Sequence, residues 1–229
     1  MAYPESFQIK LRREFLRRTF RVIFHVLFRL KVTGLENVPQ TGACIVAHNH
    51  VSIIEPALVL AFLPRRAEAI GAQELWTRRG QSVIIRLYGT MPVRRGDAQR
   101  DLIKKMLEVL NAGSPLLIAP EGTRSHVPGM GLAQPGIGYL LDQARVPVVP
   151  VAIVGSTDDN LKAAFRFKRP TMTMHLGTPF EIPPIGLGGK DRREARQKNA
   201  DQVMIRIGAM LPEEYWGVYA EPIRTAKAP

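Results

Sequence analysis

One segment, Ala43-Cys44-Ile45-Val46-Ala47-His48-Asn49-His50-Val51-Ser52-Ile53-Ile54-Glu55-Pro56, places polar residues between an apolar run and a proline. The apolar run over residues 43–47 predicts a short buried strand. Pro56 favours the first turn of a helix, so we expect a helix to start beside it. Polar residues between a strand end and a helix start are where open α/β sheets build their sites. We therefore predict a site between residues 47 and 56.

Within this segment, His50 and Glu55 suit general base catalysis. Glu55 is expected at or near the helix cap, where the helix dipole favours its ionised form. A carboxylate there can hold one imidazole nitrogen and leave the other nitrogen free to take a proton. His48 is a second candidate for the base, and a histidine at a strand end can also be a hydrogen-bonded structural residue. The segment alone leaves these interpretations open.

The rest of the chain alternates apolar runs with helical patterns. We expect further strands at 66–71, 115–119, 146–154 and 171–176, and a short extended piece at 89–96. Helices are expected from Pro56, over 73–87 with an interruption near Gly80, after Asp97, over 137–145 and near 191–211. Alternation of this kind predicts an α/β fold with a mostly parallel sheet flanked by helices on both faces.

Residues 1–32 differ in composition from residues 33–229, which we expect to form the main domain. They contain eight Lys or Arg and two Glu, so they hold half of the net charge, together with many apolar residues. The longest stretch without Lys or Arg, residues 22–28, is far shorter than the roughly 20 residues that span a bilayer. The pattern predicts a basic amphipathic helix in the interface of an anionic membrane. A helix that packs on its own domain and turns its arginines to water fits the pattern equally, and a nucleic-acid arm fits less well.

The overall composition limits the classes of fold, partner and site that the chain can have. A length of 229 residues suits one sizeable α/β domain, and the net charge of +12 predicts an anionic partner. The single cysteine, Cys44, excludes an internal disulfide and is expected in the core. No metal site is expected, because the five histidines show no ligand spacing beyond His48 and His50.

Two arginines at the ends of extended segments are candidate anion ligands. Arg95 follows a short extended segment, and Arg124 lies in a loop after a predicted strand. Gly122 would let the backbone approach a ligand closely, and guanidinium groups suit phosphate. Each arginine alone is a weak signal, because surface arginines usually serve solubility.

Four segments in order resemble the sequence blocks of the glycerolipid acyltransferases, the family of bacterial 1-acylglycerol-3-phosphate acyltransferases. They are Asn49-His50-x4-Glu55, Gly89-x-Met-Pro-Val-x-Arg95, Pro120-Glu121-Gly122-Thr123-Arg124-Ser125 and Val146-Pro147-Val148-Val149-Pro150. The resemblance covers roughly residues 33–220. The family's first block usually ends in aspartate, whereas position 55 here is Glu, and this departure leaves the identity of the acceptor open.

The resemblance implies direct acyl transfer from a thioester to a hydroxyl, with His50 rather than His48 as general base. Glu55 would fix the imidazole tautomer and raise the pKa of His50 somewhat. Asn49, Arg95, Glu121, Gly122, Thr123 and Arg124 would bind the substrate, with the two arginines on the acceptor phosphate.

The implied acceptor is 1-acylglycerol 3-phosphate, and the product is phosphatidic acid for phospholipid synthesis. The donor would be acyl-CoA or acyl-carrier protein, with no cofactor. The enzyme would be monotopic or peripheral on the cytoplasmic face of the cell membrane. Three alternatives stay open: another lysolipid or glycerol 3-phosphate as acceptor, a thioester hydrolase, and a basic peripheral membrane protein without catalysis.

Overall fold

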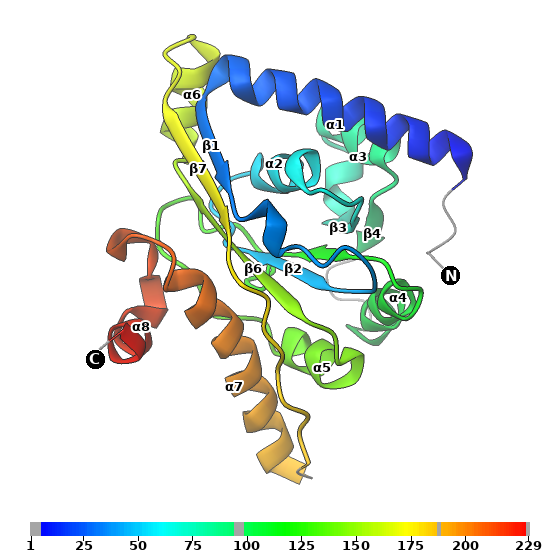
Figure 1. Ribbon diagram of the computed structural model, residues 1–229, viewed down its shortest axis with the longest axis vertical. Helices are drawn as coiled ribbons and strands as arrows, with labels where there is room; N and C mark the ends of the chain where they lie inside the picture. Colours follow the sequence, from blue (N-terminus) through cyan, green and yellow to red (C-terminus); the bar gives the residue numbers. More distant parts are fainter. Residues whose placement is uncertain (1–5, 94–98, 187–188, 228–229) are drawn as a thin grey trace.

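A mixed sheet with helices on both faces forms the body of the molecule (Figure 1). The computed structural model describes residues 6–93, 99–186 and 189–227. Its strands are β1 (Arg29–Thr33), β2 (Ile45–His48), β3 (Glu68–Ala72), β4 (Met91–Val93), β5 (Leu116–Ile118), β6 (Val148–Val154) and β7 (Thr171–Leu176). The described residues give one seven-stranded sheet in the order β1-β7-β6-β2-β5-β3-β4. Every neighbouring pair is parallel except β6 and β7. The predicted fold class is confirmed.

Two hydrophobic cores lie on opposite faces of this sheet. The helices are α1 (Phe7–Leu27), α2 (Glu55–Phe62), α3 (Gln81–Tyr88), α4 (Gln99–Asn111), α5 (Pro135–Ala144), α6 (Asp158–Phe165), α7 (Gly189–Gly208) and α8 (Ala220–Lys227), with short 3-10 turns over Leu35–Asn37, Gln73–Trp76, Glu213–Tyr215 and Gly217–Tyr219. In β2, Ile45 and Ala47 pack towards α4, α5 and α7, whereas Val46 packs towards α1, α2 and α6. Both faces of the central strand are therefore buried, as its continuous apolar run predicts.

The N-terminal segment departs from the prediction at its end. The helix ends at Leu27, and residues 29–32, expected to be helical, belong to strand β1. β1 pairs in parallel with β7, so this part of the segment is built into the sheet. Helix α6, which follows a Thr157 N-cap, was not predicted at all.

Helix α1 turns arginines towards the protein and apolar side chains away from it. The Arg13 guanidinium forms a buried ion pair with Glu68, with N–O distances of 2.6 and 2.7 Å. Arg17 donates to the Leu63 carbonyl, and Arg21 donates to the Ala61 carbonyl at 2.6 Å. The exposed apolar residues of this helix form its outer stripe: Phe7, Leu11, Phe15, Val22, Ile23 and Val26. The helix therefore packs on its own domain, as the alternative interpretation expected, but that interpretation is wrong in turning these three arginines to water.

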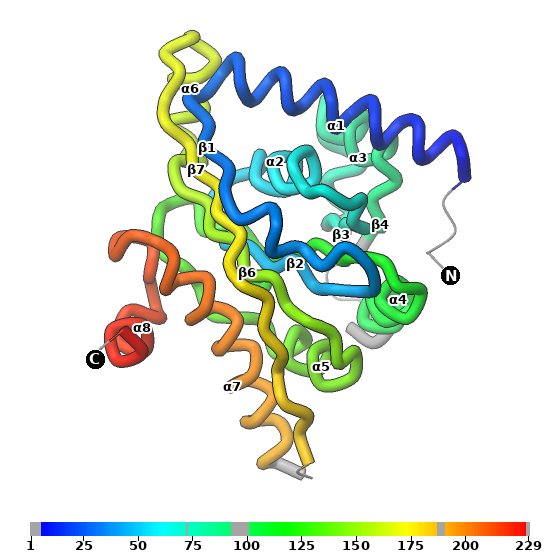
Figure 2. The backbone as a smooth tube through the Cα atoms, in the orientation of Figure 1, coloured from blue at the N-terminus to red at the C-terminus, as the bar shows by residue number. Residues whose placement is uncertain are grey.

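The backbone tube in Figure 2 shows α1 on one side of the sheet and α7 with α8 on the other. Among the described residues, no helix has the length and apolar character needed to cross a bilayer.

Candidate active site

The carboxyl end of β2 brings His50 and Glu55 into contact. β2 ends at His48, and the chain turns through residues 49–54 into α2, whose first residue is Glu55. Nδ1 of His50 lies 2.8 Å from Oε2 of Glu55. Within the described residues, Nε2 of His50 has no hydrogen-bond partner, so that nitrogen can accept a proton. The predicted pairing of an imidazole with the carboxylate is present.

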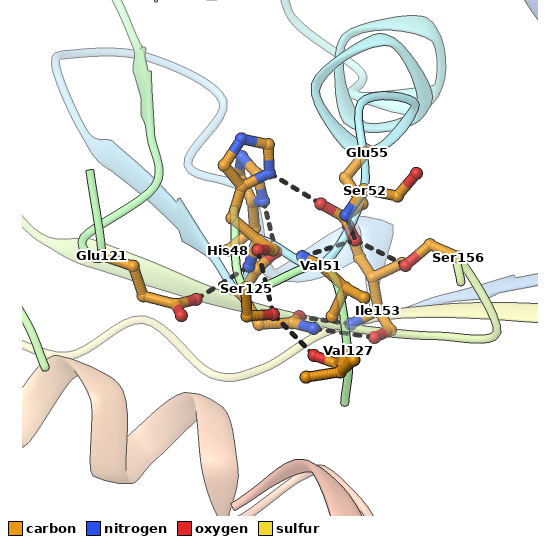
Figure 3. A network of polar contacts seen from close by, with 11 residues as sticks. His48, Val51, Ser52, Glu55, Glu121, Ser125, Val127, Ile153 and Ser156 are labelled. Atoms are coloured by element: carbon orange, nitrogen blue, oxygen red, sulfur yellow. Dashed lines mark hydrogen bonds and ion pairs between the residues drawn. The ribbon is translucent and has the colours of Figure 1, made fainter. Parts of the chain in front are cut away.

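Glu55 is held by four hydrogen bonds, although its side chain is fully buried. Its Oε1 accepts from the backbone N–H groups of Val51 and Ser52, both at 3.0 Å, and from Ser156 Oγ at 2.5 Å. Figure 3 shows these three groups converging on Glu55. The bonds keep the carboxylate in one orientation towards the imidazole.

Ser156 is a residue of this hydrogen-bond network that the sequence interpretation missed. It follows β6, which pairs in parallel with β2, so both strands end at the same edge of the sheet. The polar run Gly155-Ser156-Thr157-Asp158 after a predicted strand was the available signal.

Glu121 fixes the backbone of the site rather than facing a ligand. Its Oε1 accepts the His50 backbone N–H at 2.9 Å, and its Oε2 accepts the Gly131 N–H at 2.8 Å. The loop after β5 also pairs with the loop after β2, because the N–H groups of Ser125 and His126 donate to the carbonyls of His50 and Val51. His126 adopts a left-handed φ of 65°, which is uncommon outside glycine.

Burial shifts the pKa values of both members of the pair. Desolvation, with smaller electrostatic contributions from Arg124 and His126, lowers the pKa of His50 to about 4. The expectation of a raised His50 pKa is therefore wrong, because burial lowers it. Desolvation also raises the pKa of Glu55 to about 7, against the lowering effect of its hydrogen bonds. Above pH 7 the pair is a carboxylate with a neutral imidazole, which is the form that can accept a proton.

His48 neighbours His50 but is not hydrogen-bonded to Glu55 and does not line the cavity described below. It is buried, its Nδ1 lies 2.7 Å from the Asn49 carbonyl oxygen, and burial lowers its pKa to about 4. Its ring meets the His50 ring edge to face at 5.4 Å between centroids. His48, His50 and Glu55 each have an atom of a metal-ligating type, and these atoms lie within 4.8 Å of one another. The spacing of the histidines in the sequence did not predict this group of three. The direct contact between His50 and Glu55 makes this grouping a hydrogen-bonded pair beside a second imidazole.

An apolar cavity of about 440 Å³ adjoins the pair. It is lined by residues of α1, α2, β3, α3 and α6, and His50 and Arg124 belong to its wall. Leu16 and Phe20 of α1 and Leu60 of α2 are among its apolar lining residues. The volume is in the range of small-molecule sites, and the lining suits a hydrocarbon chain. The contribution of α1 to this wall was not predicted.

Three other predicted substrate ligands, Asn49, Gly122 and Thr123, do not line the cavity. The Asn49 amide is buried and bonds to both the N–H and the carbonyl of Ile153, at 2.8 and 2.9 Å, so it fixes β2 to β6 rather than facing the cavity. Gly122 adopts a φ of 68° in a turn, where a Cβ would lie 2.8 Å from Gln134 Cγ. Thr123 is exposed. Arg95 lies outside the described residues.

Comparisons with known proteins agree on one family. A sequence model of the Acyltransferase family matches residues 29–154, which is more than half of the chain. The chloroplastic 1-acyl-sn-glycerol-3-phosphate acyltransferase BAT2 of Brassica napus is 25% identical over 138 residues, covering 59% of this chain and 40% of that protein. The human 1-acyl-sn-glycerol-3-phosphate acyltransferase alpha is 27% identical over 166 residues, covering 71% and 58% respectively. This chain thus spans about half the length of these relatives.

A solved structure has the same fold. The crystal structure of the 1-acyl-sn-glycerophosphate (LPA) acyltransferase PlsC from Thermotoga maritima superposes with a TM-score of 0.59 at 23% identity. The superposition covers 96% of this chain and 80% of that one. His50, Glu55, Glu121 and Arg124 lie inside the residues that the family model matches, whereas Ser156 lies just outside them. On the strength of that match, the chain belongs to the acyltransferase family.

Proposed function

We propose that this chain is an O-acyltransferase that moves a fatty acyl group from a thioester to the free hydroxyl of 1-acylglycerol 3-phosphate, forming phosphatidic acid. One observation carries the proposal: His50, which is paired with Glu55, lines the same apolar cavity as a cationic side chain, Arg124. A proton acceptor, a space for hydrocarbon and a phosphate ligand are the three parts that this reaction needs. The names of the relatives, which are acyltransferases of this acceptor, support the same choice.

The pair can carry both proton transfers of the reaction. Nε2 of His50 takes the proton of the acceptor hydroxyl as its oxygen attacks the thioester carbonyl carbon. A C–O bond forms, the C–S bond breaks, and the imidazolium returns the proton to the leaving thiolate. Glu55 holds the proton on Nδ1 and stabilises the imidazolium between these steps. No covalent acyl-enzyme and no cofactor are required. The donor is acyl-CoA or acyl-carrier protein.

Arg124 is proposed to bind the acceptor phosphate, together with Arg95. We expect Arg124→Ala to raise the acceptor KM about tenfold or more, because a charge-assisted hydrogen bond to phosphate is lost. The donor KM should stay nearly unchanged, and equal losses for donor and acceptor would contradict the assignment. Arg193→Ala, an exposed arginine of α7, is the control.

Membrane attachment is proposed to occur through the outer stripe of α1, on the cytoplasmic face of the cell membrane. The stripe is apolar and exposed, and the cations Lys10, Arg12 and Arg18 on the same helix are exposed beside it. Anionic lipids attract such cations, and the interface accepts the apolar side chains. The other side of the same helix lines the cavity, so a lipid acceptor would have a short path from the bilayer to His50.

The test is mass spectrometry of the products formed from long-chain acyl-CoA and a panel of acceptors. The panel contains 1-acylglycerol 3-phosphate, lysolipids with other headgroups and glycerol 3-phosphate, and it is repeated with acyl-carrier protein as donor. We expect phosphatidic acid from the intact protein and none from His50→Ala, with His175→Asn, at an exposed position of β7, as control. Loss of thioester without an acylated product would indicate a hydrolase. No turnover with any acceptor would indicate a membrane protein without catalysis.

A further inference from the structure

The last residue of α6 and the chain after it expose two phenylalanines among three cations. The segment 165–169 reads Phe165-Arg166-Phe167-Lys168-Arg169, and all five residues are exposed. The side chains of Phe165 and Phe167 are 68% and 72% exposed. Single exposed apolar residues are ordinary, but two aromatic rings within three residues at one loop tip mark a contact surface.

The backbone holds this loop in a fixed shape. The N–H groups of Arg166, Phe167 and Lys168 all donate to the carbonyls of Ala163 or Ala164 at 2.9 to 3.1 Å. Phe167 and Arg169 adopt left-handed φ values of 54° and 47°. This conformation is unfavourable for bulky residues and persists only where the surrounding structure imposes it. The exposure of Phe167 is therefore built into the fold.

The loop continues the surface formed by α1. The Arg169 guanidinium donates to the His25 carbonyl of α1 at 3.0 Å, and Figure 1 shows α6 beside the end of α1 that leads into β1. Val22, Ile23 and Val26 of the outer stripe lie in these last turns of α1. Phe165 also belongs to the wall of the cavity that holds His50.

We propose that residues 165–169 are a second contact with an anionic lipid bilayer. Phe165 and Phe167 enter the interfacial region, and Arg166 and Lys168 meet the lipid phosphates. Aromatic rings favour the membrane interface, and adjacent cations add attraction to anionic headgroups. The bilayer is favoured over a protein partner because the loop is continuous with the outer stripe and borders a cavity suited to hydrocarbon. This inference rests on the proposed membrane contact of α1, and the experiment below reads the two contacts separately.

Two contacts would also fix the orientation of the enzyme. A single helix lying in the interface can roll about its long axis, whereas a loop beside one end of the helix and off its axis prevents this rotation. The wall of the cavity formed by α1 and α6 would then stay against the lipid.

The first experiment places an environment-sensitive fluorophore at one position at a time. Phe167→Cys can be labelled selectively, because the native Cys44 is fully buried. Vesicles of phosphatidylcholine with about one third phosphatidylglycerol should blue-shift and brighten the label, and brominated acyl chains should quench it. Phe15→Cys reports on α1, and Val218→Cys, an exposed position in Gly217–Tyr219 on the other face of the sheet, is the control.

The outcomes separate the two contacts. A response at positions 167 and 15 but not at 218 supports the inference. A response at 15 without one at 167 overturns the loop contact and leaves the α1 contact standing. No response at either position overturns both, and an equal response at 218 shows adsorption without orientation and overturns the loop contact as well.

The second experiment removes the two rings. Phe165→Ser with Phe167→Ser should weaken binding to the same vesicles about tenfold, because apolar area is lost from the contact. Val218→Ser should leave the affinity unchanged. Equal melting temperatures show that the fold is retained, and unchanged vesicle binding by the folded double variant overturns the inference.

Discussion

At the scale of single residues, the hydrogen bonds of Glu55 show how the site holds a glutamate at a position where the family usually has aspartate. Its Oε2 reaches Nδ1 of His50 at 2.8 Å, while Oε1 fits among three donors from two separate segments. One of these donors, Ser156, is contributed by the chain after β6. We expect Glu55 and Ser156 to act together in positioning the imidazole.

The pH dependence of catalysis should follow the protonation of the His50–Glu55 pair. The pKa of Glu55 is raised to about 7 and that of His50 is lowered to about 4, so the pair takes up its first proton near pH 7. That proton removes the form in which Nε2 can accept. We expect kcat/KM to be constant above about pH 7 and to fall about tenfold per unit below it. A profile that stays flat down to pH 5 would contradict this assignment.

Ser156→Ala should move this acidic limb to higher pH. The Ser156 hydroxyl lowers the pKa of Glu55, so its loss raises that pKa further, and an increase of about one unit is expected. At high pH the variant should approach the activity of the parent protein. A purely structural role would instead reduce activity equally at every pH. The Ser125 hydroxyl donates to the Val127 carbonyl at 2.6 Å and lies 3.5 Å from the His50 carbonyl oxygen, and it is not hydrogen-bonded to Glu55, so Ser125→Ala should leave the midpoint unchanged.

Cys44 should not react with thiol reagents in the folded protein. It is fully buried in β-sheet surroundings, and burial raises the pKa of its thiol to about 11. The thiolate is the reactive form, so an aromatic disulfide reagent should label Cys44 only in denaturant. Rapid labelling without denaturant would show that the strand region opens.

The part of the site that lies close together in sequence could be predicted, and the part assembled by the sheet could not. His50 and Glu55 are five residues apart, so a short loop suffices to join them. Ser156 reaches Glu55 only because β6 is next to β2, and strand order is not visible in a linear pattern. Asn49 was assigned to the substrate from the resemblance alone, because its buried partner, Ile153, lies in β6 and could not be identified from the sequence.

At the scale of elements, the contact between α5 and α7 depends on one glycine. A Cβ at Gly138 would lie 1.9 Å from the Arg196 carbonyl oxygen, so the two helices approach more closely than any larger residue allows. We expect Gly138→Ala to lower the free energy of unfolding by about 1–3 kcal/mol, measured by chemical denaturation. In the same helix, Gly136→Ala would meet Ile103 at an ordinary 3.7 Å and should not destabilise the protein.

Most elements could be predicted from hydrophobic patterns, and the exceptions have physical causes. The strand predicted at 171–176 has the bounds of β7 because its alternating residues are buried on one face. β1 was merged into the preceding helix because its sequence, Arg29-Leu30-Lys31-Val32-Thr33, continues the basic and apolar mixture of α1. The inward arginines of α1 could not be predicted, because their partners lie 40 to 75 residues away along the chain.

At the scale of the whole molecule, membrane binding should be separable from folding. Deleting residues 1–28 would remove the cavity wall and leave Glu68 without Arg13, so release of that truncated protein from vesicles would be ambiguous. A triple variant changes only exposed residues of the outer stripe: Leu11→Gln, Phe15→Gln and Val22→Gln. We expect this triple variant to lose most of its binding to anionic vesicles in sedimentation assays.

The matching control tests whether the triple variant is still folded and active. The triple variant should retain its melting temperature and should still acylate a short-chain, water-soluble acceptor. Binding of the parent protein should weaken as salt is added, because screening reduces the attraction between cations and lipid headgroups. Unchanged vesicle binding by the triple variant would refute attachment through α1.

The pairing of β1 with β7 has a consequence for how the protein is made. Thr33 and His175, 142 residues apart, are hydrogen-bonded neighbours across these two strands. On the ribosome, β1 emerges early and has no partner until nearly the whole sheet has been translated, and long-range parallel pairing is slow to form. During that interval α1 is already complete, and its outer stripe is free to meet a bilayer. Under the proposed attachment through α1, the nascent chain would reach the membrane surface before its own sheet closes.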